Sequence, residues 1–170
     1  MSQSMYLNQF EKSAAIGSLD LKMTPDASVM TVRFDPTDTS TTSIKAGEGM
    51  VLTDLGANDI NAQGLPLVTK RTHNYDAIYG IKIFNIKKND NIPGDVFEVA
   101  TTGAVMFLQC KAAVRRGYGV ALNVSSSNYI GQVEETPSGS TPCGIALDKG
   151  AIGDIIRVEI HSDNMGVSAT

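Results

Sequence analysis

The side chains that could do chemistry in this 170-residue chain are few and scattered. The segment Ser138-Gly139-Ser140 offers two hydroxyl groups, but it lies between Pro137 and Pro142. A serine nucleophile of the elbow type needs a sharp turn between a strand and a helix. The prolines and small polar residues here are instead typical of a surface loop, so we predict no catalytic serine.

The sequence also has no motif typical of a metal site or of an acid–base pair. The histidines His73 and His161 are far apart in the sequence, and neither has a second His or Cys at ligand spacing. Cys110 and Cys143 are interpreted as small buried hydrophobic residues, although a pairing between neighbouring strands stays open. The carboxylates stand mostly beside turns, where Asp often bonds nearby backbone. We therefore expect no enzymatic activity, no metal and no cofactor.

Glycine-containing turns recur, each before an alternating stretch. The pairs Gly47-x-Gly49 and Gly117-x-Gly119 lack the third glycine of a dinucleotide loop and precede expected strands rather than helices. Two further turns contain Gly94-Asp95 and Gly153-Asp154. Glycine supplies the positive φ of such turns, and the acidic residue can accept from nearby backbone. Because their spacing is irregular, the turns favour a meander or barrel over a fixed-period solenoid.

The elements around these turns are expected to be strands. Val, Ile and Thr make up roughly a quarter of the chain, and such side chains favour pleated sheets. Apolar residues alternate over 19–24, 79–86 and 155–160. We predict a mainly β fold, an antiparallel β-sandwich or small barrel-like meander with little helix and an N-terminal arm. The expected division is an arm and entry strand (1–24), a β domain (25–161) and a flexible C-terminal tail (162–170).

Composition and charge exclude several classes of protein. The net charge of −4 and pI near 5.1 argue against a nucleic-acid binder, which needs a basic face. No apolar run approaches the roughly 20 residues that cross a bilayer, so we expect no membrane partner. The N-terminus has neither the basic start nor the apolar stretch of a secretory signal. These features predict a protein that folds in a reducing cytoplasm, or is assembled there.

Residues 44–160 resemble the head decoration, or capsid cement, proteins of tailed bacteriophages. The resemblance lies in strand and turn signatures rather than in a catalytic motif. It rests on the segments 78–83, 92–106, 112–117, 120–122, 144–147 and 153–158. It implies a structural protein on the outer capsid surface of the virion, where it binds the major capsid protein lattice and stabilises the expanded capsid against internal DNA pressure. It also implies a homo-oligomer, with a trimer favoured over a dimer.

The contacts that such a protein needs are expected on its arm and on two loops. The arm either docks on its own domain or lies over a neighbouring subunit by β-addition. The segment 37–43 has no apolar residue to fix it, and the segment 56–71 is long for a loop in a compact β domain. Candidate contacts to the capsid or a sister subunit are Tyr6, Leu7, Phe10, Thr39, Thr41, Leu65, Lys70 and Arg71.

Two other functions would suit a small β-rich protein. A receptor- or glycan-binding β module of a phage fibre or another virion appendage would need an aromatic-lined groove, and the chain has no Trp and 6% aromatic residues. A small trimeric β-barrel enzyme acting on nucleotides would need a catalytic Asp and phosphate-binding turns, and no such set is found. The glycan-binding appendage is kept as the alternative.

Overall fold

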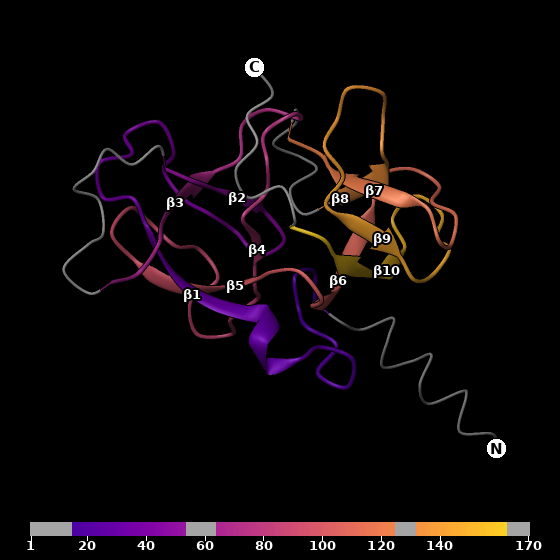
Figure 1. Ribbon diagram of the computed structural model, residues 1–170, viewed down its shortest axis with the longest axis horizontal. Coiled ribbons are helices and arrows are strands. Elements are labelled where there is room, and N and C mark those ends of the chain that lie inside the picture. Colours follow the sequence, from indigo (N-terminus) through magenta and orange to yellow (C-terminus); the bar gives the residue numbers. More distant parts are fainter. Residues whose placement is uncertain (1–14, 54–63, 125–131, 163–170) are drawn as a thin grey trace.

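Two closed five-stranded barrels lie side by side in the computed structural model, which describes residues 15–53, 64–124 and 132–162 (Figure 1). Barrel 1 contains β1 (Val29–Phe34), β2 (Gly49–Leu52), β3 (Leu67–Lys70), β4 (Gly80–Lys82) and β5 (Val96–Ala100). Barrel 2 contains β6 (Val105–Cys110), β7 (Gly119–Leu122), β8 (Gln132–Glu135), β9 (Gly144–Ala146) and β10 (Ile155–Ile160). The 3₁₀ helix η1 (Asp26–Ser28) is the only helical element of the described residues. The mainly β prediction is confirmed.

The strand order departs from a simple meander. Barrel 1 runs β1-β3-β2-β4-β5 and closes by pairing β5 with β1. The pair β1–β3 is parallel and the other four pairs are antiparallel. Barrel 2 has the same arrangement, with β6–β8 as its parallel pair. A parallel pair needs a connection that crosses over, which here carries β2 in barrel 1 and β7 in barrel 2.

The two barrels repeat one another strand for strand and in register. In barrel 1, Arg33 lies opposite Leu67 of β3 and Val96 of β5. In barrel 2, Gln109 lies opposite Gln132 of β8 and Ile155 of β10. The chain is therefore an internal duplication at the level of the fold, in which β1 to β5 correspond to β6 to β10.

The recurring glycine turns follow from this duplication. Gly47 and Gly117 stand before β2 and β7 with φ of 84° and 82°, and Gly94 and Gly153 stand before β5 and β10 with φ of 93° and 86°. The carboxylate of Asp95 accepts from the Ile92 N–H at 2.8 Å, and the carboxylate of Asp154 accepts from the Ala151 N–H at the same distance. Two kinds of turn, each used once per barrel, thus account for four turns with irregular spacing.

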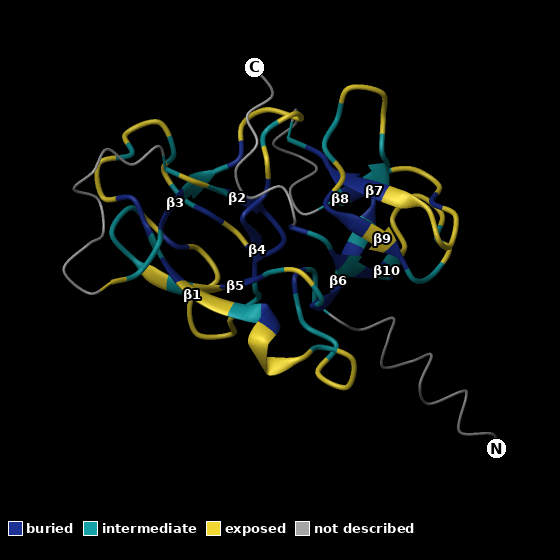
Figure 2. Ribbon diagram, in the orientation of Figure 1, coloured by how far each residue is buried: buried dark blue, intermediate teal, exposed yellow. Residues whose placement is uncertain are grey.

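The barrel interiors and the seam between the barrels form the core (Figure 2). β10 alternates between buried and half-buried residues, as its sequence predicts. One cluster, built around Phe34, Met50 and Val68, fills barrel 1. The other fills barrel 2 and continues across the seam to Ile81 and Ala100 of barrel 1. The two barrels therefore share apolar packing.

The entry strand predicted over 19–24 is mostly wrong. Leu19 makes a single antiparallel bridge to Met106, and residues 21–23 form a turn. Leu21 and Met23 are 82% and 48% exposed. The chain bends because Thr24 bonds the backbone of Val105 through its side chain and then leads into η1. The division into 1–24, 25–161 and 162–170 stays a prediction.

Cys110 and Cys143 are both free, buried and part of the barrel 2 cluster. Burial raises the pKa of Cys110 to about 11 and that of Cys143 to about 12. Since the thiolate is the reactive form, both thiols should be inert in the folded protein. We expect less than about one tenth of the thiols to react with an aromatic disulfide reagent at pH 8 in native buffer, and two per chain to react in denaturant. Rapid native labelling would contradict this burial.

Candidate functional site

The loop 37–43 folds back onto β3 through one carboxylate. Asp38 accepts from the Ser40 N–H at 2.8 Å, from the Ser40 hydroxyl at 2.7 Å and from the Thr41 N–H at 3.2 Å. Its second oxygen accepts from the hydroxyl of Thr69 on β3. Burial raises the pKa of Asp38, but these hydrogen bonds outweigh it and lower the pKa to about 2.

Four candidate contact residues consequently lie along or next to β3. Thr39 is exposed, whereas Thr41, Leu65 and Lys70 are half-buried. The Lys70 ammonium lies 2.5 Å from the Glu48 carboxylate, which holds it beside β2. We call the set Thr39, Thr41, Leu65 and Lys70, which lie on or next to β3 and not all on one side of it, the β3 face. Tyr6, Leu7 and Phe10 lie outside the described residues.

Acid should loosen the β3 face through Asp38. Because the pKa of Asp38 is lowered in the folded state, its contribution to stability is present above the ordinary value of 3.8 and is lost as pH falls toward 2. Solvent screening limits the loss to at most about 1 kcal/mol. Urea unfolding at pH 7, 4 and 2.5 should show this fall, and Asp38→Asn should make it smaller. Asp26→Asn, at an exposed site, should leave the fall unchanged, and an equal effect of both variants would contradict the role of Asp38.

Arg71 occupies a different environment from the β3 face. It is 1% exposed and lies between the barrels. Its Nη2 donates to the carbonyl of Asn74 and to that of Thr141, which belongs to the β8–β9 connection of barrel 2. Its Nε and Nη1 have no hydrogen-bond partner among the described residues. Arg71 was predicted as a partner contact, but its side chain is used inside the molecule, where burial lowers its pKa.

Close backbone contacts complete this joint. The Thr141 N–H donates to the Asn74 carbonyl at 2.8 Å, and the Thr141 hydroxyl donates to the Tyr75 carbonyl at 2.9 Å. Gly49 of barrel 1 faces Leu122 of barrel 2, where an added Cβ would lie 3.1 Å from the leucine methyl. Polar and apolar contacts together hold the two barrels in one orientation.

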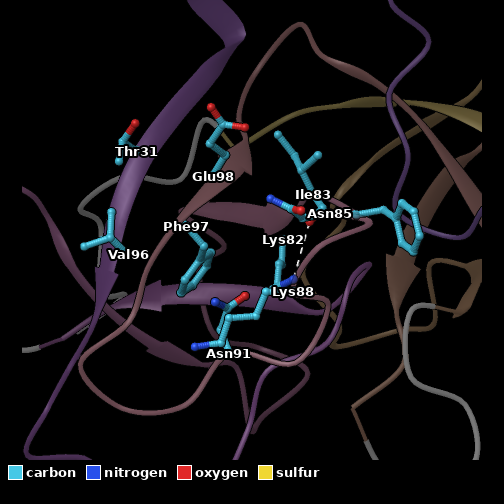
Figure 3. A pocket seen from close by; sticks show the side chains of 10 residues that line it. Thr31, Lys82, Ile83, Asn85, Lys88, Asn91, Val96, Phe97 and Glu98 are labelled. Carbon is cyan, nitrogen blue, oxygen red and sulfur yellow. Dashed lines mark hydrogen bonds between the residues drawn. The ribbon is translucent and has the colours of Figure 1, made fainter.

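A pocket of about 340 Å³ lies at the end of barrel 1 (Figure 3). Lys82 on β4 is fully buried there, and its ammonium donates to the Asn89 carbonyl at 2.8 Å and lies 5.9 Å from the centre of the Phe97 ring. Burial lowers the pKa of Lys82, and the charges of Asp90 and Glu48 offset this only in part. In barrel 2 the corresponding position is Ala146, so the lysine is specific to barrel 1.

Several polar groups of this pocket are already engaged with the protein. The Lys88 ammonium lies 2.6 Å from the Asp95 carboxylate. Asp95 in turn accepts from the Asn91 side chain at 3.3 Å, which ties the connection between β4 and β5 to the barrel. The arrangement fastens a loop over the end of barrel 1, and it brings together no nucleophile with a base.

Two further observations bear on chemistry. Within residues 15–53, 64–124 and 132–162, no group of three His, Cys, Asp or Glu side chains could hold a metal ion. His73 instead stacks on Tyr75, with 5.1 Å between the ring centres. No helix in the same ranges is long and apolar enough to span a membrane.

Comparison with known proteins finds similarity at the level of structure. No protein-family model matches the chain, and no curated protein matches it. The crystal structure of the head fiber gp8.5 N base of bacteriophage phi29 is similar. It has 13% sequence identity and a TM-score of 0.45, and the match covers 82% of this chain and 98% of that chain. This degree of similarity assigns no function to the chain.

Proposed function

We propose that this protein is a structural component of a tailed-phage virion that binds the outer surface of the major capsid protein lattice and stabilises the expanded head. The proposal is supported by the resemblance of residues 44–160 to head decoration proteins. That range contains nine of the ten strands, β2 to β10, and thus most of both barrels. In this role the chain is no enzyme and needs no cofactor.

The observation that carries the proposal is the fixed joint between the barrels. A protein that bridges capsid subunits must transmit force without bending. Buried Arg71, the Gly49–Leu122 contact and the apolar seam resist a hinge motion between the two closed barrels. Closed barrels also leave few strand edges at which a sheet could open.

The β3 face is the proposed capsid contact. Thr39 offers a hydroxyl group, Leu65 offers an apolar side chain, and Lys70, whose ammonium is paired with Glu48, offers its half-buried aliphatic stem, a mixture typical of an interface rim and core. Stable attachment needs interfaces of about 1,200–2,000 Å². A homo-oligomer, with a trimer favoured, would add avidity of about 10²–10⁴ over one contact.

The test is binding to expanded, undecorated heads of the phage that encodes the chain. Purified protein is titrated against the heads, sedimented and imaged by cryo-electron microscopy. We expect saturable binding at regular lattice positions and greater resistance of filled heads to heat. Leu65→Asp together with Thr39→Glu should weaken binding at least about tenfold, because a charge would enter the contact.

The matched control is Lys149→Ala, an exposed position of barrel 2, which should bind like the wild type. Circular dichroism and urea unfolding must show that the β3 variant is folded. Absence of binding to heads by the wild-type chain would overturn the proposal.

A receptor- or glycan-binding appendage module is the second candidate. The observation that favours it is the exposed Tyr75, which is 67% exposed and stacks on His73, because such a ring face can pack against a sugar. A glycan array separates the two functions. Specific glycan binding that is lost in Tyr75→Ala, without binding to heads, would favour the appendage.

A further inference from the structure

One edge of β1 has open backbone groups. Every second residue of β1 bonds to β5, as shown by the bonds of Phe34 to Asp95 and of Ser28 to Thr101 at the two ends of the pair. The intervening residues face the opposite edge. There the Arg33 N–H donates to the Pro66 carbonyl at 2.9 Å, and the Val29 N–H is turned back to the Asp26 carbonyl of η1, whereas Thr31 has no backbone partner on this edge within the described ranges.

The corresponding edge in barrel 2 is occupied. Residues 17–20 run antiparallel to β6. The Gly17 N–H donates to the Phe107 carbonyl at 2.8 Å, the Phe107 N–H to the Ser18 carbonyl at 2.9 Å, and the Asp20 N–H to the Val105 carbonyl at 2.8 Å. Leu19 of this segment packs on the barrel 2 core. The duplication thus shows what such an edge accepts: an extended segment that supplies an apolar side chain.

A comparison of Met30 with Met106 shows that β1 lacks the covering segment that β6 has. Met106 of β6 is 0% exposed under this cover, whereas Met30, its counterpart in β1, is 40% exposed. Val29, Met30 and Thr31 have no proline or lysine among them, the residues that usually guard an open edge against pairing. The edge is therefore suited to accept a strand with apolar side chains.

We propose that the β1 edge at Val29–Thr31 accepts residues 6–10 of a second copy of this chain as an added β-strand. This segment contains Tyr6, Leu7 and Phe10, which would cover Met30 as Leu19 covers Met106. Residues 17–20 of the same chain are committed to β6, so the 14 residues before Ala15 are the next segment toward the N-terminus. Extended, they reach up to about 45–50 Å, enough for a neighbouring subunit. Exchange of an identical element is a low-cost route to a homo-oligomer.

This self-association goes beyond capsid binding and can be tested without heads. Thr31→Cys and Phe10→Cys chains are prepared separately, mixed and oxidised, and the products are identified by intact mass. Tyr6→Cys, Leu7→Cys, Asn8→Cys and Gln9→Cys replace Phe10→Cys in parallel, so that every position of the segment 6–10 is tested opposite Thr31. We expect at least one arm variant to form the mixed disulfide with Thr31→Cys at least tenfold more than with Ile152→Cys, which is also an exposed position and lies on barrel 2.

Hydrogen exchange on the chain without residues 1–14 provides the second measurement. In the full-length protein at high concentration the Thr31 amide should exchange at least tenfold more slowly than in the truncated chain. The Phe107 amide, already bonded to Ser18, should be equally protected in both and reports that the truncated chain is folded. Sedimentation should show that truncation lowers the mass of the assembly.

Three outcomes would overturn the proposal. One is that, for every arm variant, the yield of the disulfide with Thr31→Cys is no higher than the yield with Ile152→Cys. Another concerns the double variant Phe10→Cys, Thr31→Cys. If its disulfide forms only within one chain and its yield is unchanged by dilution, the arm covers its own barrel rather than that of a second copy. The third is an assembly mass that truncation does not change.

Discussion

Gly144→Ala is expected to lower the free energy of unfolding by about 3 kcal/mol or more. Gly144 begins β9, where it lies opposite Ile160 of β10 and Val120 of β7. A Cβ at this position would lie 2.1 Å from the carbonyl oxygen of Glu159. Backbone flanked by two strands cannot move away without breaking a ladder that closes barrel 2. The variant should melt about 6–12 °C below the wild type.

The matched control is Gly119→Ala in the neighbouring strand β7. Its Cβ would lie 3.5 Å from the Thr136 hydroxyl, an ordinary contact, and the backbone there does not have positive φ. We expect a change within about 0.5 kcal/mol, since alanine reduces the entropy of the unfolded chain. Urea and thermal unfolding monitored by circular dichroism measure both variants. Equal effects of the two would contradict the close approach at Gly144.

Arg71→Ala is expected to cost about 3 kcal/mol, because it leaves a cavity at the joint and removes the donor to the carbonyls of Asn74 and Thr141. The same unfolding measurements apply. Since Thr141 belongs to barrel 2, the loss should weaken the joint itself, and hydrogen exchange at the Thr141 amide should become faster.

Arg71→Met separates the volume of this side chain from its charge. Methionine fills most of the same space but carries no buried charge, and two of the guanidinium nitrogens lack partners among the described residues. Replacing a desolvated charge by an apolar side chain is often neutral or stabilising. We expect Arg71→Met to lie within about 1 kcal/mol of the wild type. A loss as large as that of Arg71→Ala would mean that the hydrogen bonds, rather than the packing, hold the joint.

Several elements could be read from local pattern because local physics decides them. The alternation over 155–160 predicted β10, and the Gly-Asp turns at Gly94 and Gly153 follow from the need for positive φ and a nearby acceptor. The Gly-x-Gly turns before β2 and β7 are equivalent positions of the duplicated fold. The duplication was not recognised from the sequence because the recurring turns are irregularly spaced along the chain. Alternation over 19–24 misled, because tertiary contacts of Thr24 override it.

The amino-acid sequence alone determined the β class, the turns that bound the strands and the burial of the cysteines, whereas it left open whether the two cysteines pair. Only the tertiary structure decided that the strands close into two matching barrels, that Arg71 lies in the joint, and that Thr31 on β1 has no edge partner among the described residues while the matching edge of β6 is covered. Strand and turn preferences arise from neighbours in the chain. Closure, burial of a charged side chain and edge pairing depend on residues far apart in sequence, so no local pattern encodes them.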